Sequence, residues 1–243
     1  MKVLGIIPAR YASSRFPGKP LIDLKGKSMI QRVYEGALKS QAMSKVIVAT
    51  DDQRIVDEVL RFGGHVCLTK ASHLSGTDRC AEVAEMNPGF DVVINIQGDE
   101  PLVNPSQLDQ LLHAFKEPEV QIATLGIHTT DKADLINPNR IKVVCDHASN
   151  ALYFSRSTIP NHDHFNGDHL AEFPYLRHIG LYAYRTNTLA HICQLKPTQL
   201  ERIESLEQLR WLFHGLKIKV VLTDIETPNI DVPEDVEKVL QFL

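Results

Sequence analysis

Residues 3–20 decide the fold, and they read VLGIIPARYASSRFPGKP. Val3 to Ile7 is a short apolar run without a charge, typical of a strand that is buried on both faces of a parallel sheet. The loop that follows it carries three cations and two serines, namely Arg10, Arg15, Lys19, Ser13 and Ser14. Ligands of open α/β sheets bind beyond the carboxyl ends of the strands, where this loop would lie. We therefore predict a phosphate site with a nucleotide as its natural ligand, the alternative being a solvated loop.

Two familiar phosphate motifs are excluded. Gly26-Lys27-Ser28 ends like a Walker A sequence, but Leu21 stands where its first glycine would be. No G-x-G-x-x-G follows any predicted strand, which disfavours a nicotinamide or flavin site. The predicted phosphate loop is therefore of another kind.

Strand-length apolar runs alternate with segments of helical period through the first half of the chain. Strands are predicted at 3–7, 46–49 and 92–96, and helices at 29–38 and 55–62. Ser28, with Gln31 three residues later, predicts a capping box, and Asn104-Pro105 predicts another helix start. The pattern predicts an α/β fold with a mostly parallel sheet between helices.

From about residue 150 the pattern changes. Aromatic strands are predicted at 151–155 and 179–184, around a polar loop at 161–169. A helix at 200–213, a strand at 218–222 and a terminal helix at 233–242 follow. We interpret residues 1–243 as a single domain that carries an insertion at about 150–215.

Composition limits the class of protein. The 243 residues include 26 Lys and Arg against 30 Asp and Glu, a net charge of −4, which argues against nucleic acid and anionic membranes as partners. The four cysteines form no C-x-x-C pair, so we expect neither a disulfide scaffold nor a thiolate zinc site. Because no signal peptide and no apolar stretch of ~20 residues is found, we expect a cytoplasmic protein without membrane insertion.

Two acidic positions are candidate magnesium ligands. Asp99 comes directly after the strand at 92–96, where a hard oxygen ligand suits Mg²⁺ beside phosphates. Gly98 before it permits a close backbone approach or a positive φ, although Asp99 could simply be a turn former. Asp231 reads locally as part of a helix start. If the two carboxylates met at ~4 Å they would repel by roughly 4 kcal/mol, and a cation would be needed between them.

A histidine cluster lies in the polar loop. His162, His164 and His169 invite a zinc assignment, but their spacing among Asn, Asp and Gly residues favours a solvated loop.

The chain resembles the 3-deoxy-manno-octulosonate (Kdo) cytidylyltransferase family. The resemblance is carried in order by residues 8–21, 75–79, 97–101, 151–156, 177–182, 204–210 and 231–235. It implies the fold of the nucleotide-diphospho-sugar transferases, and an inserted antiparallel region used for homodimerisation. It implies Mg²⁺-dependent transfer of CMP from CTP to the anomeric hydroxyl of Kdo, giving CMP-Kdo and pyrophosphate for lipopolysaccharide synthesis. Alternatives are 8-amino-Kdo or a sialic acid as acceptor and, more remotely, a non-catalytic nucleotide sensor.

The resemblance also implies roles for individual residues. Catalysis would fall to Arg10, Lys19, Asp99 and Asp231, the two aspartates holding the metal. Nucleotide binding would fall to Ala9, Arg10, Ser13, Arg15, Lys19, Ser75, Arg79 and Gln97. Sugar binding would fall to Gln97, Arg156, His178, Tyr182, Glu204 and Gln208.

Bland alternatives stand beside these roles. Ser75 to Arg79 would be a helix cap with an exposed arginine, and His178 and Tyr182 ordinary residues on one face of a strand. Glu204 and Gln208, one helical turn apart, are expected to share a helix face.

Overall fold

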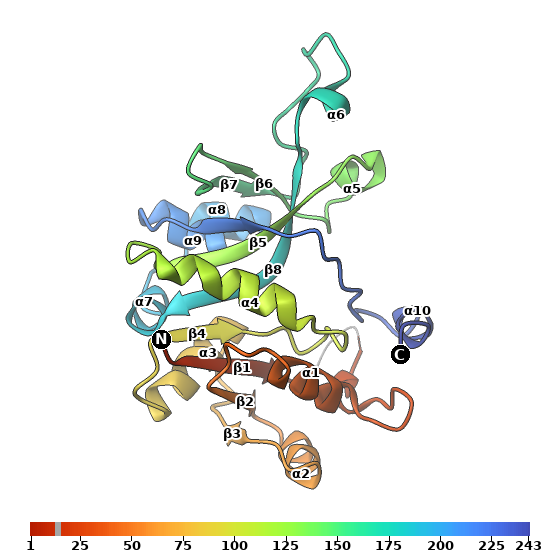
Figure 1. Cartoon of the computed structure of the whole chain (residues 1–243), viewed down its shortest axis with the longest axis vertical. Helices are drawn as coiled ribbons and strands as arrows, with labels where there is room; N and C mark the ends of the chain where they lie inside the picture. Colours follow the sequence, from red (N-terminus) through yellow and green to blue (C-terminus); the bar gives the residue numbers. More distant parts are fainter. Residues whose placement is uncertain (13–15) are drawn as a thin grey trace. The chain divides into compact units, whose positions relative to one another are not determined.

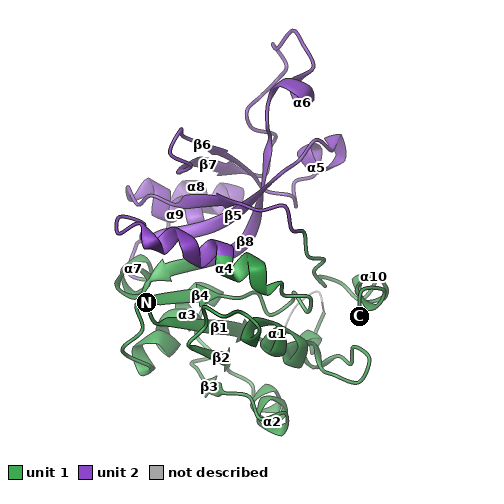
Figure 2. Cartoon of the chain, in the orientation of Figure 1, with its two compact units in different colours: residues 1–109, 183–193, 226–243 green, residues 110–182, 194–225 purple. Residues whose placement is uncertain are grey.

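The computed structural model describes residues 1–12 and 16–243, and the chain divides into two compact units (Figure 2). Unit 1 comprises residues 1–109, 183–193 and 226–243, and unit 2 comprises residues 110–182 and 194–225. The predicted insertion at about 150–215 overlaps unit 2 but differs from it in its bounds, because unit 2 begins at residue 110 and excludes residues 183–193.

Unit 1 is built on parallel strands in the order β3-β2-β1-β4 (Figure 1). Their bounds are β1 Val3–Ala9, β2 Lys45–Thr50, β3 Val66–Leu68 and β4 Val92–Asn95. In register, β1 pairs Leu4 with Lys45 on one side and Val3 with Val92 on the other. Because β1 is paired on both edges and buried on both faces, its sequence shows a continuous apolar run rather than an alternation. The predicted parallel arrangement is confirmed here, with β1 extending two residues beyond the prediction.

The helices that connect these strands are α1 Met29–Leu38, α2 Gln53–Arg61 and α3 Gly76–Met86, with a short 3-10 helix η1 at Lys19–Leu21 before α1. Unit 1 also includes α7 Thr186–Ile192 and α10 Asp235–Leu240. Helix α4, Pro105–His113, begins in unit 1 and ends in unit 2. Asn104 accepts a hydrogen bond from the Ser106 N–H at 2.9 Å, which confirms the predicted start of α4.

The start of α1 differs in part from the prediction. Ser28 accepts the Gln31 N–H at 3.3 Å, as a capping box requires. The Gln31 side chain, however, donates to Glu35 at 2.8 Å. Glu35, one turn further along α1, thus takes the Gln31 side chain that a capping box would direct to the Ser28 N–H.

The C-terminal segment is held to unit 1 by an apolar cluster. Leu24, Met29, Ile230 and Val239 are fully buried in it. This packing joins α10 to the start of α1, and Figure 1 shows the two helices as neighbours. Residue 231 is therefore held from its N-terminal side by a buried anchor, Ile230.

Unit 2 mixes parallel and antiparallel pairing. Strand β5, Ile122–His128, pairs in parallel with β9, Lys219–Leu222, while β6, Lys142–Cys145, pairs antiparallel with β7, Ala151–Ser155, and with β8, Leu176–Arg185, whose last residues belong to unit 1. The remaining elements are α5 Lys132–Ile136, α6 His169–Glu172, α8 Gln199–Glu204, α9 Gln208–Phe213 and the 3-10 helix η2 Ala114–Lys116. The antiparallel pairing predicted around residues 151–155 is present.

The helix predicted at 200–213 is wrong in one respect, because it is broken into α8 and α9. Ser205 adopts a left-handed conformation with φ 51°, and its N–H bonds back to the Glu201 carbonyl. A left-handed residue ends a helix, since the following residue leaves the helical path. Serine rarely occupies this region, so the sequence carries no glycine signal for the break.

Replacing Ile230 by alanine tests the anchor of the C-terminal segment. We expect Ile230→Ala to lower the free energy of unfolding by about 2–5 kcal/mol, because it removes a fully buried side chain from a packed cluster. Ile203→Ala is the matched control, because Ile203 is 82% exposed and its loss should change stability by less than about 0.5 kcal/mol. Urea unfolding followed by circular dichroism measures both, and equal losses would contradict the assignment.

Candidate functional site

Lys19 occupies the centre of the predicted site in unit 1. Its ammonium contacts Asp99 Oδ2 at 2.9 Å and the carbonyl oxygen of Ile230 at 2.8 Å. The loop that carries Lys19 is closed by a hydrogen bond from the Gly18 N–H to the Tyr11 carbonyl at 2.9 Å, with Gly18 at φ 74°. Only glycine adopts this conformation without strain, so Gly18 aims the lysine at the end of β4.

The backbone brings Asp99 and Asp231 into one neighbourhood. The Ile230 N–H donates to the Asp99 carbonyl at 3.0 Å, so the residue before Asp231 is bonded directly to Asp99. Asp235 Oδ2 accepts the N–H groups of Asp231 and Val232 at 3.1 and 3.2 Å and shapes the turn before α10. Lys19 supplies a positive charge beside the Asp99 carboxylate. The metal-ligand roles of the two aspartates stay a prediction.

Gly98 lets two chain segments approach closely. A Cβ at residue 98 would lie 2.7 Å from the Pro8 carbonyl oxygen, closer than any real side chain is tolerated. Of the two properties predicted for Gly98, close approach is the one in use. Gln97 lies half-buried beside it, directly after Ile96 at the end of the strand. The carboxyl ends of β1 and β4 are thereby held together.

Glu100 was missed as a site residue by sequence reasoning. Burial and the neighbouring Asp99 carboxylate raise the pKa of Glu100 to about 8, and a hydrogen bond with Thr227 opposes that shift. At neutral pH Glu100 is therefore largely protonated, so that Asp99 does not face a second full negative charge. The sequence did offer a signal for Glu100, because Asp99 and Glu100 form an acidic pair directly after a buried strand.

The other predicted nucleotide residues of the first loop are placed as follows. Ala9 is buried at the end of β1, in register with Thr50. Arg10 is exposed, and its guanidinium donates to the His73 carbonyl. Ser13 and Arg15 lie outside the described residues.

Ser75 and Arg79 both belong to the start of α3. Ser75 forms a full capping box with Asp78. Arg79 is completely buried, donates to Thr69 Oγ1, and lies 3.2 Å from Asp51 Oδ2. The alternative of a cap with an exposed arginine is thus wrong about the arginine: its charge is balanced by Asp51 inside unit 1. Whether these residues bind cytosine stays a prediction.

In unit 2, Arg156 and Glu204 form one network at the end of β7. Glu204 accepts hydrogen bonds from Ser155 Oγ at 2.7 Å and from the Arg156 N–H at 2.9 Å. The Arg156 guanidinium donates to the carbonyls of Glu204 at 2.6 Å, Pro138 at 2.9 Å and Ser205 at 3.2 Å. Arg156 therefore caps the C-terminus of α8, where a cation is favoured by the helix dipole.

Gln208 does not share a helix with Glu204, contrary to the prediction. Glu204 is the last residue of α8 and Gln208 the first of α9, with the left-handed Ser205 between them. The i, i+4 argument fails because it assumes an unbroken helix. Gln208 is buried within unit 2.

His178 and Tyr182 lie on the same face of β8. Their ring centroids are 5.3 Å apart, and Phe154 and Trp211 pack edge-on against them at 5.0 and 5.2 Å. Burial, reinforced by Arg177, lowers the pKa of His178 to about 3. Burial likewise raises the pKa of Tyr182 well above 10, with a Thr124 hydrogen bond opposing it. Both side chains are therefore neutral over the physiological range.

The hydroxyl of Thr124 contacts the ring of His178, and the tautomer of the ring follows if Thr124 donates its proton to Leu181. Thr124 Oγ1 lies 2.9 Å from His178 Nε2 and also donates to the Leu181 carbonyl at 2.8 Å. Because a hydroxyl has a single proton, it accepts from the ring, and Nε2 carries the hydrogen. His178 then presents Nδ1 as an acceptor.

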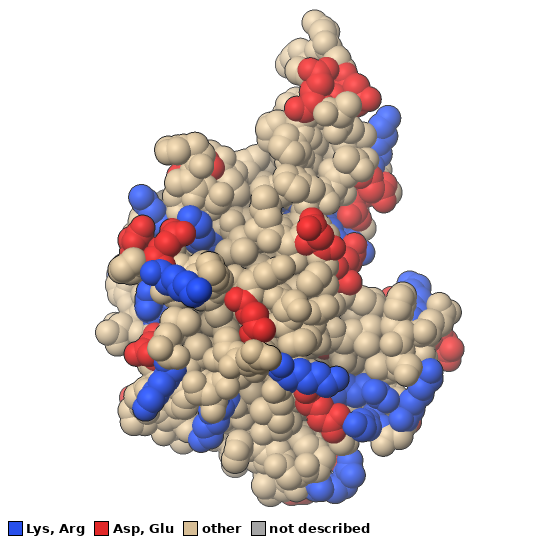
Figure 3. Space-filling view, viewed as in Figure 1, with Lys and Arg blue, Asp and Glu red and all other residues tan. Residues whose placement is uncertain are grey.

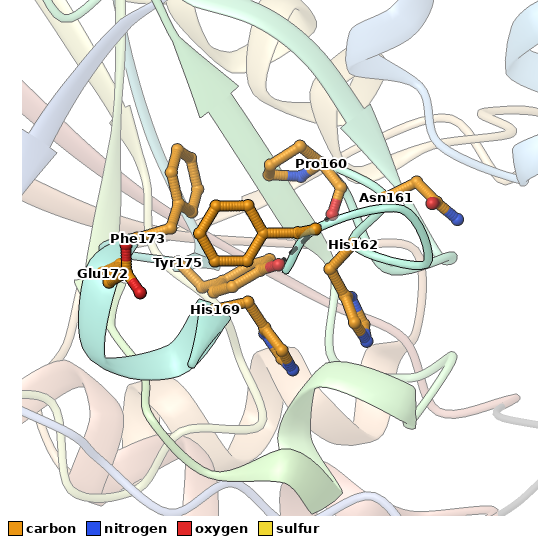
Figure 4. A pocket seen from close by; sticks show the side chains of 8 residues that line it. Pro160, Asn161, His162, His169, Glu172, Phe173 and Tyr175 are labelled. Carbon is orange, nitrogen blue, oxygen red and sulfur yellow. Dashed lines mark hydrogen bonds between the residues drawn. The ribbon is translucent and has the colours of Figure 1, made fainter. Parts of the chain in front are cut away.

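Two members of the histidine cluster, His162 and His169, line an aromatic pocket in unit 2 (Figure 4). The rings of His162 and His169 stack with centroids 3.8 Å apart, and the Tyr175 hydroxyl donates to the Pro160 carbonyl at 3.4 Å. His164 is exposed. Within the described part of the chain, no group of three His, Cys, Asp or Glu side chains is arranged to hold a metal.

Surface charge is mixed. On the face that Figure 3 shows, basic and acidic side chains are interspersed in both units. Among residues 1–12 and 16–243, no helix combines the length and the apolar character that a bilayer crossing requires.

The lowered pKa of His178 predicts a dependence of stability on pH. Between the ordinary value of 6.5 and about 3, the unfolded chain binds a proton at His178 that the folded chain does not. The free energy of unfolding should thus fall as pH decreases through this window, by up to about 1.4 kcal/mol per unit from this group. Urea unfolding of wild type and His178→Gln at several pH values should show a shallower slope for the variant. Equal slopes would contradict the assignment.

The chain is similar to known proteins over its whole length. A model of the cytidylyltransferase family matches residues 4–218. A 3-deoxy-manno-octulosonate cytidylyltransferase of Parabacteroides distasonis is 50% identical over 252 residues, covering 100% of this chain and 98% of the relative. The Bacteroides thetaiotaomicron protein of the same name is 53% identical over 250 residues, covering 100% and 98%.

A solved structure agrees with these relatives. It is a CMP:2-keto-3-deoxy-manno-octonic acid synthetase complexed with CTP, 42% identical, with a TM-score of 0.93 over 100% of this chain and 98% of that one. The likeness confirms the predicted fold class, a mixed α/β fold with a mostly parallel sheet flanked by helices. The chain belongs to the 3-deoxy-manno-octulosonate cytidylyltransferase family, and it is a nucleotidyltransferase.

Proposed function

We propose that this protein transfers CMP from CTP to the anomeric hydroxyl of Kdo, giving CMP-Kdo and pyrophosphate. The observation that carries the proposal is the Lys19 ammonium, held between Asp99 and the segment that precedes Asp231. The relatives named for this reaction, and the solved relative complexed with CTP, support the choice of substrates. Lipopolysaccharide synthesis then uses the product.

The residues of unit 1 would bind and polarise the triphosphate. Displacement at phosphorus leaves a protein mainly positioning and charge neutralisation to perform. Lys19 and Arg10 supply positive charge beside the end of β1, and a well-placed donor of this kind typically contributes ~3 to 4 kcal/mol to lowering the barrier. The raised pKa of Glu100 reduces the negative charge beside Asp99.

Magnesium fits the donor set of this site. Asp99 and Asp231 would hold the ion, because their carboxylate oxygens are the hard ligands that Mg²⁺ prefers. When bound, it would supply charge neutralisation at the phosphate and a lower pKa for the attacking hydroxyl. Lys19 already contacts Asp99, so the lysine and the ion would share this carboxylate.

The acidic sugar would be recognised by neutral and cationic groups. In unit 2 these groups are Arg156, His178, Tyr182, Glu204 and Gln208. A carboxylated polyol needs a cation together with several neutral donors and acceptors. The neutral state of His178 supports this role, because Nδ1 can then accept a hydrogen bond from a sugar hydroxyl.

We further propose a cytoplasmic homodimer that associates through the predicted insertion at about 150–215. The family resemblance supports the homodimer, because it assigns dimerisation to this region. Sedimentation equilibrium tests the proposal, and a mass equal to that of one chain would contradict it.

Pyrophosphate release tests the activity and the acceptor. Purified protein is incubated with CTP, Mg²⁺ and, in turn, Kdo, 8-amino-Kdo or a sialic acid. Kdo should give the highest kcat/KM. Release with another acid but none with Kdo would overturn the acceptor, and release with none of them would overturn the activity.

Replacing Asp99 by asparagine tests the catalytic site. Asp99→Asn removes one ligand charge with little change in volume, so turnover should be lost while the unfolding midpoint stays close to that of wild type. Asp163→Asn, at an exposed loop position of unit 2, is the matched control and should keep wild-type kcat. Unchanged turnover of Asp99→Asn at limiting magnesium would remove Asp99 from the site.

A further inference from the structure

Lys142 is a fully buried lysine in unit 2. It is the first residue of β6, and its side chain has no exposed surface. Lysine is almost never fully buried unless its ammonium is paired. Here the ammonium donates to two backbone carbonyls, that of Arg156 at 2.6 Å and that of Asn137 at 3.0 Å. Removing the ammonium from water costs free energy, a cost that a lysine on the surface does not have.

One of these carbonyls belongs to Arg156 itself, and the other, of Asn137, precedes Pro138, whose carbonyl Arg156 contacts. Arg156 is held through its N–H by the Glu204 carboxylate and through its carbonyl by Lys142. Its guanidinium also donates to Pro138 O, the residue next to the Asn137 that Lys142 contacts. The backbone and the side chain of Arg156 are therefore fixed against the same loop, and Lys142 closes the arrangement.

Strand register connects Lys142 to His178 as well. Lys142 pairs with Ser155 on β7 and with Arg177 on β8. The carbonyl of Ile141, the preceding residue, accepts the His178 N–H at 2.8 Å. Residues 141 and 142 thus contact both groups of predicted sugar ligands. Lys142 contacts Arg156, which is bonded to Glu204, and Ile141 contacts His178.

The ammonium is held by its hydrogen bonds in spite of its burial. Burial lowers the pKa of Lys142 and Arg156 adds to this effect, while the carboxylates of Glu204 and Asp134 partly oppose it. A neutral apolar side chain would leave the carbonyls of Arg156 and Asn137 without their donor, and a buried polar group without a partner is costly.

We propose that Lys142 is a positioning residue for the acidic sugar: it holds Arg156 and Glu204 at a fixed place relative to His178. It acts through these residues, because its own side chain has no exposed surface with which to touch a substrate. The inference rests on the proposed function, since it assumes that Arg156, Glu204 and His178 bind Kdo. CTP binding, which is assigned to unit 1, should not depend on Lys142.

The test compares Lys142→Met with Lys219→Met. Methionine keeps the length of the side chain and removes the donor and the charge. Lys219 lies on β9 of the same unit and pairs with Glu117 at 3.1 Å, so its variant controls for loss of a lysine. KM for Kdo, KM for CTP and kcat are measured by pyrophosphate release, the Kd for CTP by calorimetry, and the unfolding midpoint by circular dichroism.

We expect Lys142→Met to raise KM for Kdo by roughly 10-fold or more, because small displacements of ligating groups have large effects. Its Kd for CTP should stay within about twofold of wild type, as should every parameter of Lys219→Met. Unchanged KM for Kdo, or parallel losses for both substrates, would overturn the inference and leave Lys142 a purely structural residue.

Two further outcomes are kept distinct. If Lys142→Met is not recovered folded, Lys142→Gln, which removes the charge and shortens the side chain, is measured instead, and the same split between Kdo and CTP decides. If wild type itself releases no pyrophosphate with Kdo, the proposed function fails, and the inference fails with it. Wild-type turnover with an unchanged KM in the variant overturns the inference alone.

Discussion

The contact between the Lys19 ammonium and the Asp99 carboxylate is the interaction on which the site in unit 1 depends. It joins the loop after β1 to the loop after β4, and the same ammonium also holds the Ile230 carbonyl of the C-terminal segment. Three distant parts of the chain thus meet at one cation. Such an arrangement is stable only because buried packing supports it: Ile230 lies in the apolar cluster with Leu24 and Met29. The electrostatic centre and the hydrophobic anchor are therefore neighbours in the chain.

Much of this fold was predictable, because burial on both faces leaves a continuous apolar run in the sequence. Strands β1, β2 and β4 and the starts of α1 and α4 follow from such local signals. The neighbourhood of Asp99 and Asp231 was not predictable from local physics, since it is made by a backbone hydrogen bond between residues far apart in the chain. For these positions only the family resemblance gave a reason to pair them.

Buried charge is the other feature that sequence reasoning could not locate. Arg79 and Lys142 look like surface residues in a one-dimensional pattern, and both are completely buried in their own units. Each is stable because specific partners surround it: Asp51 and Thr69 for Arg79, two backbone carbonyls for Lys142. Partners of this kind come from other strands and loops, and no periodicity reveals them.

The break between α8 and α9 has a consequence for protein engineering. Ser205 leaves the helical path, and the carbonyls of Glu204 and Ser205 are turned toward the Arg156 guanidinium. Substitutions chosen to merge α8 and α9 into one continuous helix would improve local propensity and bond those carbonyls within the helix. Arg156 would then lose two acceptors. Such a variant would be more stable to heat, but its Arg156 side chain would be less well positioned. Gains in stability commonly conflict with activity in this way.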